Sequence, residues 1–319
     1  MKKFSIGYRT LKTAVGAALA IAIAHFFDLQ FYTAAGILTI LCIQPTKRKS
    51  VHAVYTRFVA SILGMLLAWL CFELISYHPI MLGLMFIVFI PLLVSFHITA
   101  GFVSSAVIIL HIYSVGHFSL ALLQNEISLM LIGYGVGLAV NMYMPDIQPK
   151  LDKYRLQIEA YYQKIFSEIA QYLRNGDTLW DGNELIEAAT VINKAKALAF
   201  QDVENHLTRK SNLYYVYFDM REQQLEIIER ILPKITALPV IVQQAEIVAV
   251  FMEDLSEHVH SGNTASHFIE KLDAVKVKFA QMPLPTNHQT FLAMAALYQC
   301  IEEMDKYLAI KRSFAGLQK

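Results

Sequence analysis

Six apolar stretches follow one another in the first 145 residues, and they limit the possible folds more than any other feature. They occupy residues 10–26, 30–44, 53–76, 80–96, 98–118 and 127–145. A helix needs about 20 apolar residues to cross a bilayer, with a range of about 17–25. The stretch 30–44 is short by this measure, and 80–96 contains Pro91. We therefore predict about six membrane spans, with four or five as the alternative.

Charge divides the chain into two different halves. Residues 1–145 hold eight Lys or Arg and three Asp or Glu, a net charge of +5, whereas residues 146–319 have a net charge of −4. Over the whole chain only 17% of residues are charged, against about 25% in soluble domains. We therefore expect a transmembrane domain at 1–145 and a water-soluble domain at 146–319.

The basic residues of the first half indicate its topology, and they are Lys2, Lys3, Arg9, Lys12, Lys47, Arg48, Lys49 and Arg57. The acidic residues fall at the opposite ends of the predicted spans, and they are Asp28, Glu73 and Glu126. Lys and Arg are enriched in cytoplasmic loops. We therefore expect the N-terminus, the loop at 45–52 with Lys47, Arg48 and Lys49, and the second domain to be cytoplasmic.

The start of the chain has an alternative interpretation. "MKK" followed by "VGAALAIAIA" has the basic start, apolar core and small residues of a secretory signal. However, the basic region reaches Lys12, and Ala14, Ala18 and Ala22 form a stripe that suits close helix packing. These features favour a retained first span.

Small residues line one helical face of the third apolar stretch. Arg57, Ala60, Ser61, Gly64 and Ala68 share this face, because they are spaced i, i+3, i+4, i+7 and i+11. Small side chains let another helix approach closely, so the arginine would face protein. It could extend its charge to the cytoplasmic interface, or it could present its guanidinium to an anion moving along a helix interface.

Other residues extend these two roles to the rest of the membrane half. Gly133 and Gly137 in the sixth stretch are predicted to serve helix packing, as are Ala60, Gly64 and Ala68. The candidates for a transport pathway are Arg57, Ser61, His111, Tyr113 and Asn141. His111 is the deepest histidine, and it suits either hydrogen-bonded packing or a proton relay. Glu73 is the acid expected at membrane depth, which favours a channel or a weakly coupled carrier.

Two segments of this half resemble the aromatic acid exporter family, which is related to fusaric acid resistance proteins. They are "FYTAAGILTILCIQPT" at 31–46 and "YTRFVASILGMLLA" at 55–68. Ser61 and Ile62 stand where many members have a Gly-Thr-rich turn, so the second match is partial. The resemblance implies an integral membrane protein linked to efflux of aromatic carboxylates. It also implies a bacterial inner-membrane location and a homodimer, because some relatives carry two such units in one chain.

The second half reads as a series of helices. They are expected at about 151–173, 183–209, 211–236, 240–260, 264–281 and 286–313, and the last is predicted to begin with a capping box of Thr286 and Gln289. "YFDMREQQLEIIERI" at 217–231 and the segment 282–311 are similar to the soluble C-terminal domain of bacterial members of the family. The predicted fold is therefore all-α, a polytopic membrane bundle followed by a cytoplasmic antiparallel helical bundle.

Several classes of function are not supported by the sequence. It contains no Gly-rich phosphate loop and no catalytic constellation, so we expect no enzyme and no cofactor. His258 and His260 are two apart on a predicted helix and point to different faces, so we expect no metal site. Cys42, Cys71 and Cys300 lack disulfide or zinc spacing. The net charge of −4 argues against nucleic acid.

Two functions remain. The favoured one is an inner-membrane transporter in the lipid bilayer that exports aromatic or other organic anions. The alternative is a membrane-tethered binding or regulatory module whose spans serve mainly as an anchor. Over half of the chain lies in the soluble domain, which supports the alternative, but an anchor needs only one span.

Overall fold

The computed structural model describes residues 7–206, 212–262, 265–314 and 316–317. Lys2 and Lys3 lie outside the described residues. Within this part of the chain there are twelve α-helices, one short 3-10 helix and no strand. The prediction of an all-α protein is confirmed.

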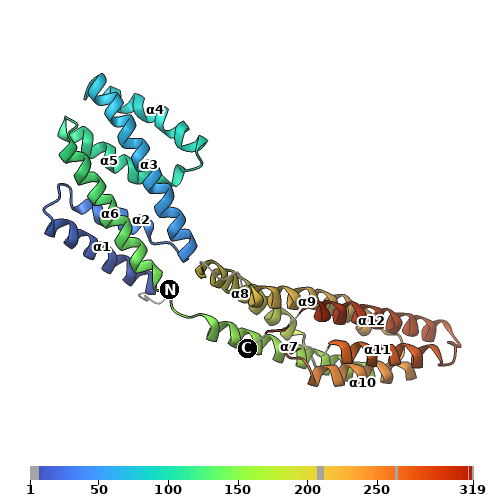
Figure 1. Cartoon of the computed structure of the whole chain (residues 1–319). Coiled ribbons are helices and arrows are strands. Elements are labelled where there is room, and N and C mark those ends of the chain that lie inside the picture. Colours follow the sequence, from blue (N-terminus) through green and yellow to red (C-terminus); the bar gives the residue numbers. More distant parts are fainter. Residues whose placement is uncertain (1–6, 207–211, 263–264, 315, 318–319) are drawn as a thin grey trace. The chain divides into compact units, whose positions relative to one another are not determined.

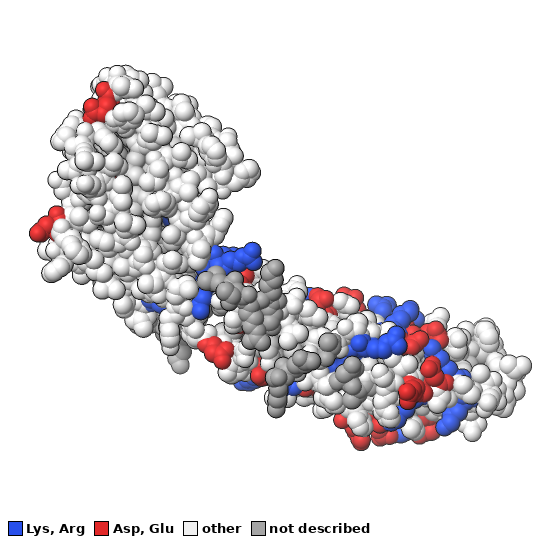
Figure 2. All heavy atoms as spheres, viewed as in Figure 1, with Lys and Arg blue, Asp and Glu red and all other residues white. Residues whose placement is uncertain are grey.

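Tertiary contacts divide the chain into two compact units (Figure 1). Unit 1 runs to Pro145 and also takes in a short segment that begins at Glu204, and unit 2 comprises the rest of the chain from Asp146. The two surfaces differ as the composition predicts. Figure 2 shows a nearly uncharged surface over α1–α6 and a dense mixture of acidic and basic side chains over the helices of unit 2.

Unit 1 contains six α-helices of unequal length: α1 (Tyr8–Phe26), α2 (Thr33–Cys42), α3 (Lys47–Leu74), α4 (Pro79–Ser95), α5 (Phe102–Val115) and α6 (Leu120–Met142), with the 3-10 helix η1 (Thr99–Gly101) before α5. Among the described helices, α3 and α6 are long and apolar enough to cross a membrane by length and composition. The helices α2 and α4 and the segment Thr99–Val115 are apolar but shorter. The number of spans stays a prediction.

The sixth helix begins earlier than the sequence pattern predicts. We expected it at 127–145, whereas α6 begins at Leu120 because the Ser119 hydroxyl accepts a hydrogen bond from the Leu122 N–H at 3.1 Å. A side chain in this position satisfies one of the free amides at a helix start. As a consequence Glu126 lies inside the helix, not before it. Its place relative to a membrane span stays a prediction.

Unit 2 contains α7 (Gln148–Asn175), α8 (Asn183–Asn205) up to Val203, α9 (Leu213–Thr236), α10 (Gln243–Glu257), α11 (Ala265–Ala280) and α12 (His288–Ser313). Their apolar faces meet in one core. The capping box of α12 is formed by Asn287 and Thr290, not by Thr286 and Gln289 as predicted. The turn before the helix ends one residue later than the pattern suggested.

A buried polar cluster lies inside the core of unit 2. Arg221 is 1% exposed, and it donates to the Tyr217 hydroxyl at 3.1 Å and to the side-chain oxygen Oε1 of Gln224 at 3.0 Å. Lys311 is also buried and donates to the backbone carbonyl of His260 at 2.8 Å, which accepts from Arg221 as well. Buried charges persist in this way only when they have partners. The cluster joins α9 and α12 to the segment after α10.

Candidate functional site

The small-residue face of α3 is buried along its length. Arg57, Ala60, Ser61, Gly64 and Ala68 are all buried, and the arginine is 9% exposed. The opposite face of the helix is apolar and exposed, with Phe58, Ile62 and Leu66 among its residues. Arg57 therefore points into the protein and not away from it, although it lies only ten residues from the start of α3.

Close packing holds η1 against the turn of α3 that carries Arg57. A Cβ atom at Gly101 would lie 2.3 Å from the Ala60 Cβ and 3.3 Å from the Arg57 Cα, so only glycine fits. One turn further along α3, a Cβ at Gly64 would lie 3.2 Å from the Ser105 Cβ of α5. The glycines therefore bring η1 and α5 directly onto the arginine face.

The guanidinium of Arg57 is incompletely paired. Its Nε and Nη1 atoms are buried and hydrogen-bond to no described residue. Ser61 lies four residues further along the same buried face of α3. The Tyr134 hydroxyl is 3.1 Å from the Ser61 hydroxyl, and either can donate. A neutral donor that is buried without a partner costs about 1–3 kcal/mol, and a cationic donor costs more. An anion beside Arg57 would satisfy both nitrogens. We call Arg57, Ser61 and Tyr134 the Arg57 cluster.

The two predicted packing glycines of α6 lie against α2. A Cβ at Gly133 would be 2.7 Å from the Leu38 Cβ, and one at Gly137 would be 3.0 Å from the Cys42 Cβ. Thr39 of α2 donates to the Gly133 carbonyl at 2.8 Å. These contacts fix α2 onto the helix that carries Tyr134.

Asn141 belongs to a separate buried cluster. Its side-chain amide donates to the Gln44 carbonyl at 3.0 Å and to the Ser50 hydroxyl at 2.6 Å, and its oxygen accepts from Lys12 at 3.3 Å. Lys12 is itself buried, although a basic residue near a predicted span end suggests a solvated one. The cluster ties α1, the α2–α3 connection and the last turn of α6 together.

The remaining pathway candidates lie away from Arg57. The Tyr113 ring packs against Phe72 with ring centroids 5.6 Å apart. The His111 Nδ1 atom lies 3.0 Å from a carboxylate oxygen of Glu126, which is 0% exposed. Sequence reasoning missed Glu126 because it was assigned to a span end. Ser119 as a helix cap was the signal that could have found it.

The basic residues at the predicted loop form the first turn of α3. Lys47 is half-buried, Arg48 and Lys49 are exposed, and the Thr46 hydroxyl caps the helix by accepting from the Lys49 N–H at 3.3 Å. Positive charge at a helix N-terminus opposes the helix dipole and costs typically about 0.3–1 kcal/mol per group. Helix stability therefore does not explain these three residues.

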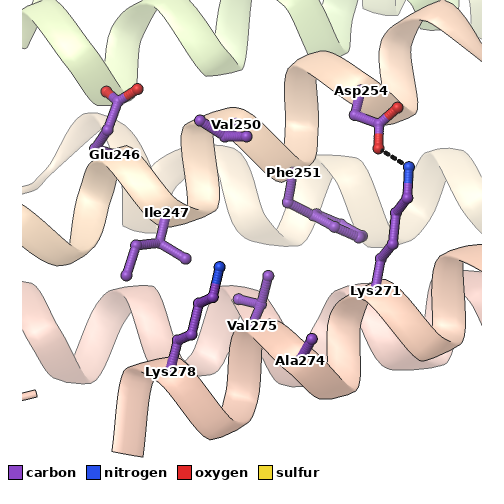
Figure 3. A pocket seen from close by; sticks show the side chains of 9 residues that line it. All are labelled: Glu246, Ile247, Val250, Phe251, Asp254, Lys271, Ala274, Val275 and Lys278. Atoms are coloured by element: carbon purple, nitrogen blue, oxygen red, sulfur yellow. Dashed lines mark hydrogen bonds and ion pairs between the residues drawn. The ribbon is translucent and has the colours of Figure 1, made fainter. Parts of the chain in front are cut away.

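Unit 2 has an open groove of about 350 Å³ between α10 and α11. Figure 3 shows its walls of Val250, Phe251 and Val275, with Lys278 reaching between the two helices and an ion pair of Asp254 and Lys271 at the other end. The groove shares no residue with the Arg57 cluster. It is not part of the candidate pathway.

Two family models match nearly the whole chain. "Aromatic acid exporter family member 1" matches residues 4–144, and "Putative aromatic acid exporter C-terminal domain" matches residues 148–312. The chain is 46% identical over 315 residues to "Uncharacterized protein YqjA" from Bacillus subtilis (strain 168). The aligned residues make up 99% of this chain and 98% of that protein. The solved "Crystal structure of putative membrane protein from Clostridium difficile 630" is 18% identical with a TM-score of 0.45, and covers 51% of this chain and 97% of that chain.

Proposed function

The chain belongs to the aromatic acid exporter family of membrane proteins, and on this premise we propose that it exports aromatic or other organic anions across the bacterial inner membrane. The observation that carries the proposal is the buried guanidinium of Arg57, whose Nε and Nη1 atoms have no described partner. Charged side chains inside membrane domains mark substrate or ion pathways. An anion that passes this point would gain the two hydrogen bonds that the protein leaves unmade.

The chemistry of the Arg57 cluster fits a carboxylate with an aromatic body. A guanidinium binds carboxylates through two parallel hydrogen bonds. One turn further along the same face of α3, the Ser61 and Tyr134 hydroxyls form a buried polar pair, and the other residues of this face are small. We infer that the carboxylate engages Arg57 while the apolar body of the substrate follows the interface between α3 and α6.

We propose six spans with the N-terminus and unit 2 in the cytoplasm. The ten residues of α2 extend about 15 Å, half of the hydrocarbon core. Its flanking segments must therefore be shielded by protein, which the packing of α2 between α1 and α6 would allow. Lys47, Arg48 and Lys49 support this orientation, because the positive-inside bias accounts for charges that the helix itself disfavours.

We further propose that the transporter is a homodimer in the lipid bilayer. One unit of six helices is small for a closed pathway, and many large apolar side chains of unit 1 are exposed, among them Leu66, Val88 and Leu131. Lipid or a second copy would cover these residues.

The test compares Arg57→Gln with Arg48→Gln, which removes the same charge from an exposed position on the same helix. Cells with each variant, with the wild type or without the protein are loaded with radiolabelled benzoate, cinnamate and salicylate. We expect the wild type and Arg48→Gln to lower accumulation of at least one acid severalfold, and Arg57→Gln to lose most of this effect. Equal accumulation with and without the protein for the whole panel would refute anion export.

The alternative, a tethered binding or regulatory module, keeps one specific support: unit 2 contains the 350 Å³ groove. Flux in liposomes distinguishes the two proposals. A chain that ends at residue 149 retains flux if unit 1 is the transporter, provided that the truncated protein still folds by circular dichroism. Full-length protein that binds a ligand in unit 2 but moves no anion would favour the alternative.

A further inference from the structure

Glu126 stands apart from the other acids of unit 1. It lies inside α6 and is fully buried, whereas Asp28 and Glu73 are exposed. One carboxylate oxygen faces the His111 Nδ1 atom at 3.0 Å, and the other accepts from the Asn125 amide at 3.2 Å. A buried carboxylate is costly unless it is paired or protonated. The pair of His111 and Glu126 can satisfy this need with a single shared proton.

The α1–α2 connection covers this pair. The Phe31 ring stacks on the His111 ring with centroids 4.1 Å apart and an angle of 8° between the planes. The neighbouring Gln30 exchanges two hydrogen bonds with Asn125, at 2.8 Å and 3.1 Å. Phe31 has φ of +56°, in the left-handed region that is unfavourable for a bulky residue. The connection is therefore held over the pair by specific contacts, in a backbone conformation with an intrinsic cost.

Other titratable side chains occur on the elements around the pair. The α1–α2 region carries His25, Asp28 and Tyr32. The others are Glu73 at the end of α3, Tyr77 after it, Tyr113 in α5 and His117 after α5. The rings of His25 and Tyr32 contact each other. Glu73 accepts from the Tyr77 hydroxyl at 2.7 Å and from the Phe118 N–H at 2.5 Å. None of these described side chains hydrogen-bonds to His111 or Glu126. Among the described residues, the side-chain hydrogen bonds of the pair thus join His111, Glu126 and Asn125.

The pair and the Arg57 cluster share helices. Glu126 and Tyr134 are eight residues apart on α6, about 12 Å along the axis. His111 and the buried Ser104, which lies beside the Tyr134 hydroxyl, are seven residues apart on α5. Side chains of α5 and α6 therefore meet at both sites, His111 with Glu126 and Ser104 with Tyr134, and each helix runs from one site to the other.

We propose that His111 and Glu126 form a proton-binding site that couples proton entry to anion export. The inference rests on the proposed function and supplies its energy source. One proton from the outer side converts the imidazole–carboxylate pair, with a net charge of −1, into a neutral imidazolium–carboxylate pair. Release to the cytoplasm restores the first state. Only the N–H bond at His111 forms and breaks, and no electron is transferred.

The main test uses full-length protein in liposomes with the membrane potential clamped. The probe is benzenesulfonate, which stays ionised throughout, so a pH gradient cannot draw it across as a neutral acid. Outward flux of the anion is measured with and without an inward proton gradient, which drives this flux in the proposed exchange. We expect the ratio of the two fluxes to exceed about threefold in the wild type, and to fall to one in Glu126→Gln and in His111→Asn. Glu73→Gln, an exposed acid, keeps the wild-type ratio.

A second measurement needs no transport. The infrared C=O band of protonated carboxylic acids is recorded as a function of pH for the full chain. In His111→Asn the imidazole is absent, so Glu126 itself must carry the proton. This variant is expected to gain a titrating band that disappears in the double variant with Glu126→Gln. Absence of that band, or a wild-type flux that is the same with and without the gradient, overturns the inference. Flux of the anion by itself still supports the proposed function. Absence of any benzenesulfonate flux counts against the proposed function, and the infrared band then decides the inference.

Discussion

Gly133 of α6 lies so close to Ala35 of α2 that a Cβ atom at Gly133 would stand 2.9 Å from the Ala35 carbonyl oxygen. A Cβ atom at Gly135, two residues further along α6, would have no atom within 4 Å. Two glycines of one helix therefore have opposite roles. The first permits close contact between helices, and the second has no such contact.

This contrast predicts opposite effects of one substitution. Gly133→Ala should destabilise unit 1 by about 1–3 kcal/mol, because overpacking forces the backbones apart. Gly135→Ala should leave stability unchanged or raise it by up to about 1 kcal/mol, since alanine favours the helix. Thermal unfolding of the full chain in detergent measures both. Equal effects of the two variants would contradict the packing shown by the structure.

Asn141→Leu should destabilise unit 1 by about 1–3 kcal/mol. The substitution removes the oxygen that accepts from the buried Lys12 ammonium, and the amide that donates to the Gln44 carbonyl and the Ser50 hydroxyl. Gln124→Leu, an exposed change on the same helix, is the matched control. Thermal unfolding in detergent compares them, and an Asn141 variant as stable as the control would argue against a structural role.

Ser61 and Tyr134 should show coupled effects on stability. Their hydroxyls are 3.1 Å apart in a buried site. A net hydrogen bond in proteins contributes about 0.5–1.5 kcal/mol, and pairs inside membrane proteins average about 0.6 kcal/mol. A double-mutant cycle with Ser61→Ala and Tyr134→Phe should therefore give a coupling energy of about that size. Strict additivity of the two single changes would mean that the bond contributes nothing.

Unit 2 should become more stable as the pH rises from 7 to 9. Burial and the neighbouring charge of Arg221 lower the pKa of Lys311 to about 7, from an ordinary value of 10.5. Between these values the unfolded chain binds the extra proton, so the free energy of unfolding rises with pH by at most about 1.4 kcal/mol per unit. Below pH 7 both states are protonated and this slope vanishes. The scan ends at pH 9 because burial raises the pKa of Cys300 to about 12, which acts in the opposite direction above that point.

Lys311→Met should remove this slope and raise stability at pH 7, whereas the exposed Lys306→Met should keep the wild-type slope. Fluorescence of Trp180 follows the unfolding of unit 2 once Trp69 of unit 1 is replaced by Phe. A Lys311→Met variant with the wild-type slope would show that another group titrates in this range.

Much of the fold could be predicted from residue spacing. The recurrence of Arg57, Ala60, Ser61, Gly64 and Ala68 indicated a face that the structure buries, because side chains spaced by three and four residues share one side of any α-helix. The change from an apolar to a charged composition near residue 146 likewise marked the place where the contacts divide. Both are local properties, and neither requires knowledge of which helices are neighbours.

The partners of the polar residues could not be predicted. For His111 we expected either hydrogen-bonded packing or a proton relay, and we placed Glu126 before the sixth apolar stretch. The structure brings the two together in one buried pair. The error began with a single boundary, because the polar run of Gln124, Asn125 and Glu126 suggested that the helix had not yet begun. Polar residues interrupt an apolar pattern whether they face water or each other. Pattern alone does not distinguish these cases.

By itself, the sequence determined that this protein is helical, that its first half suits a membrane and its second half suits water, and that α3 buries a narrow face of small residues around an arginine. The tertiary structure alone decided which polar groups meet: Ser61 with Tyr134, Lys12 with Asn141, and His111 with Glu126. The physical reason is that helix faces follow from the local period of the chain, whereas these contacts join distant positions and depend on how whole helices pack.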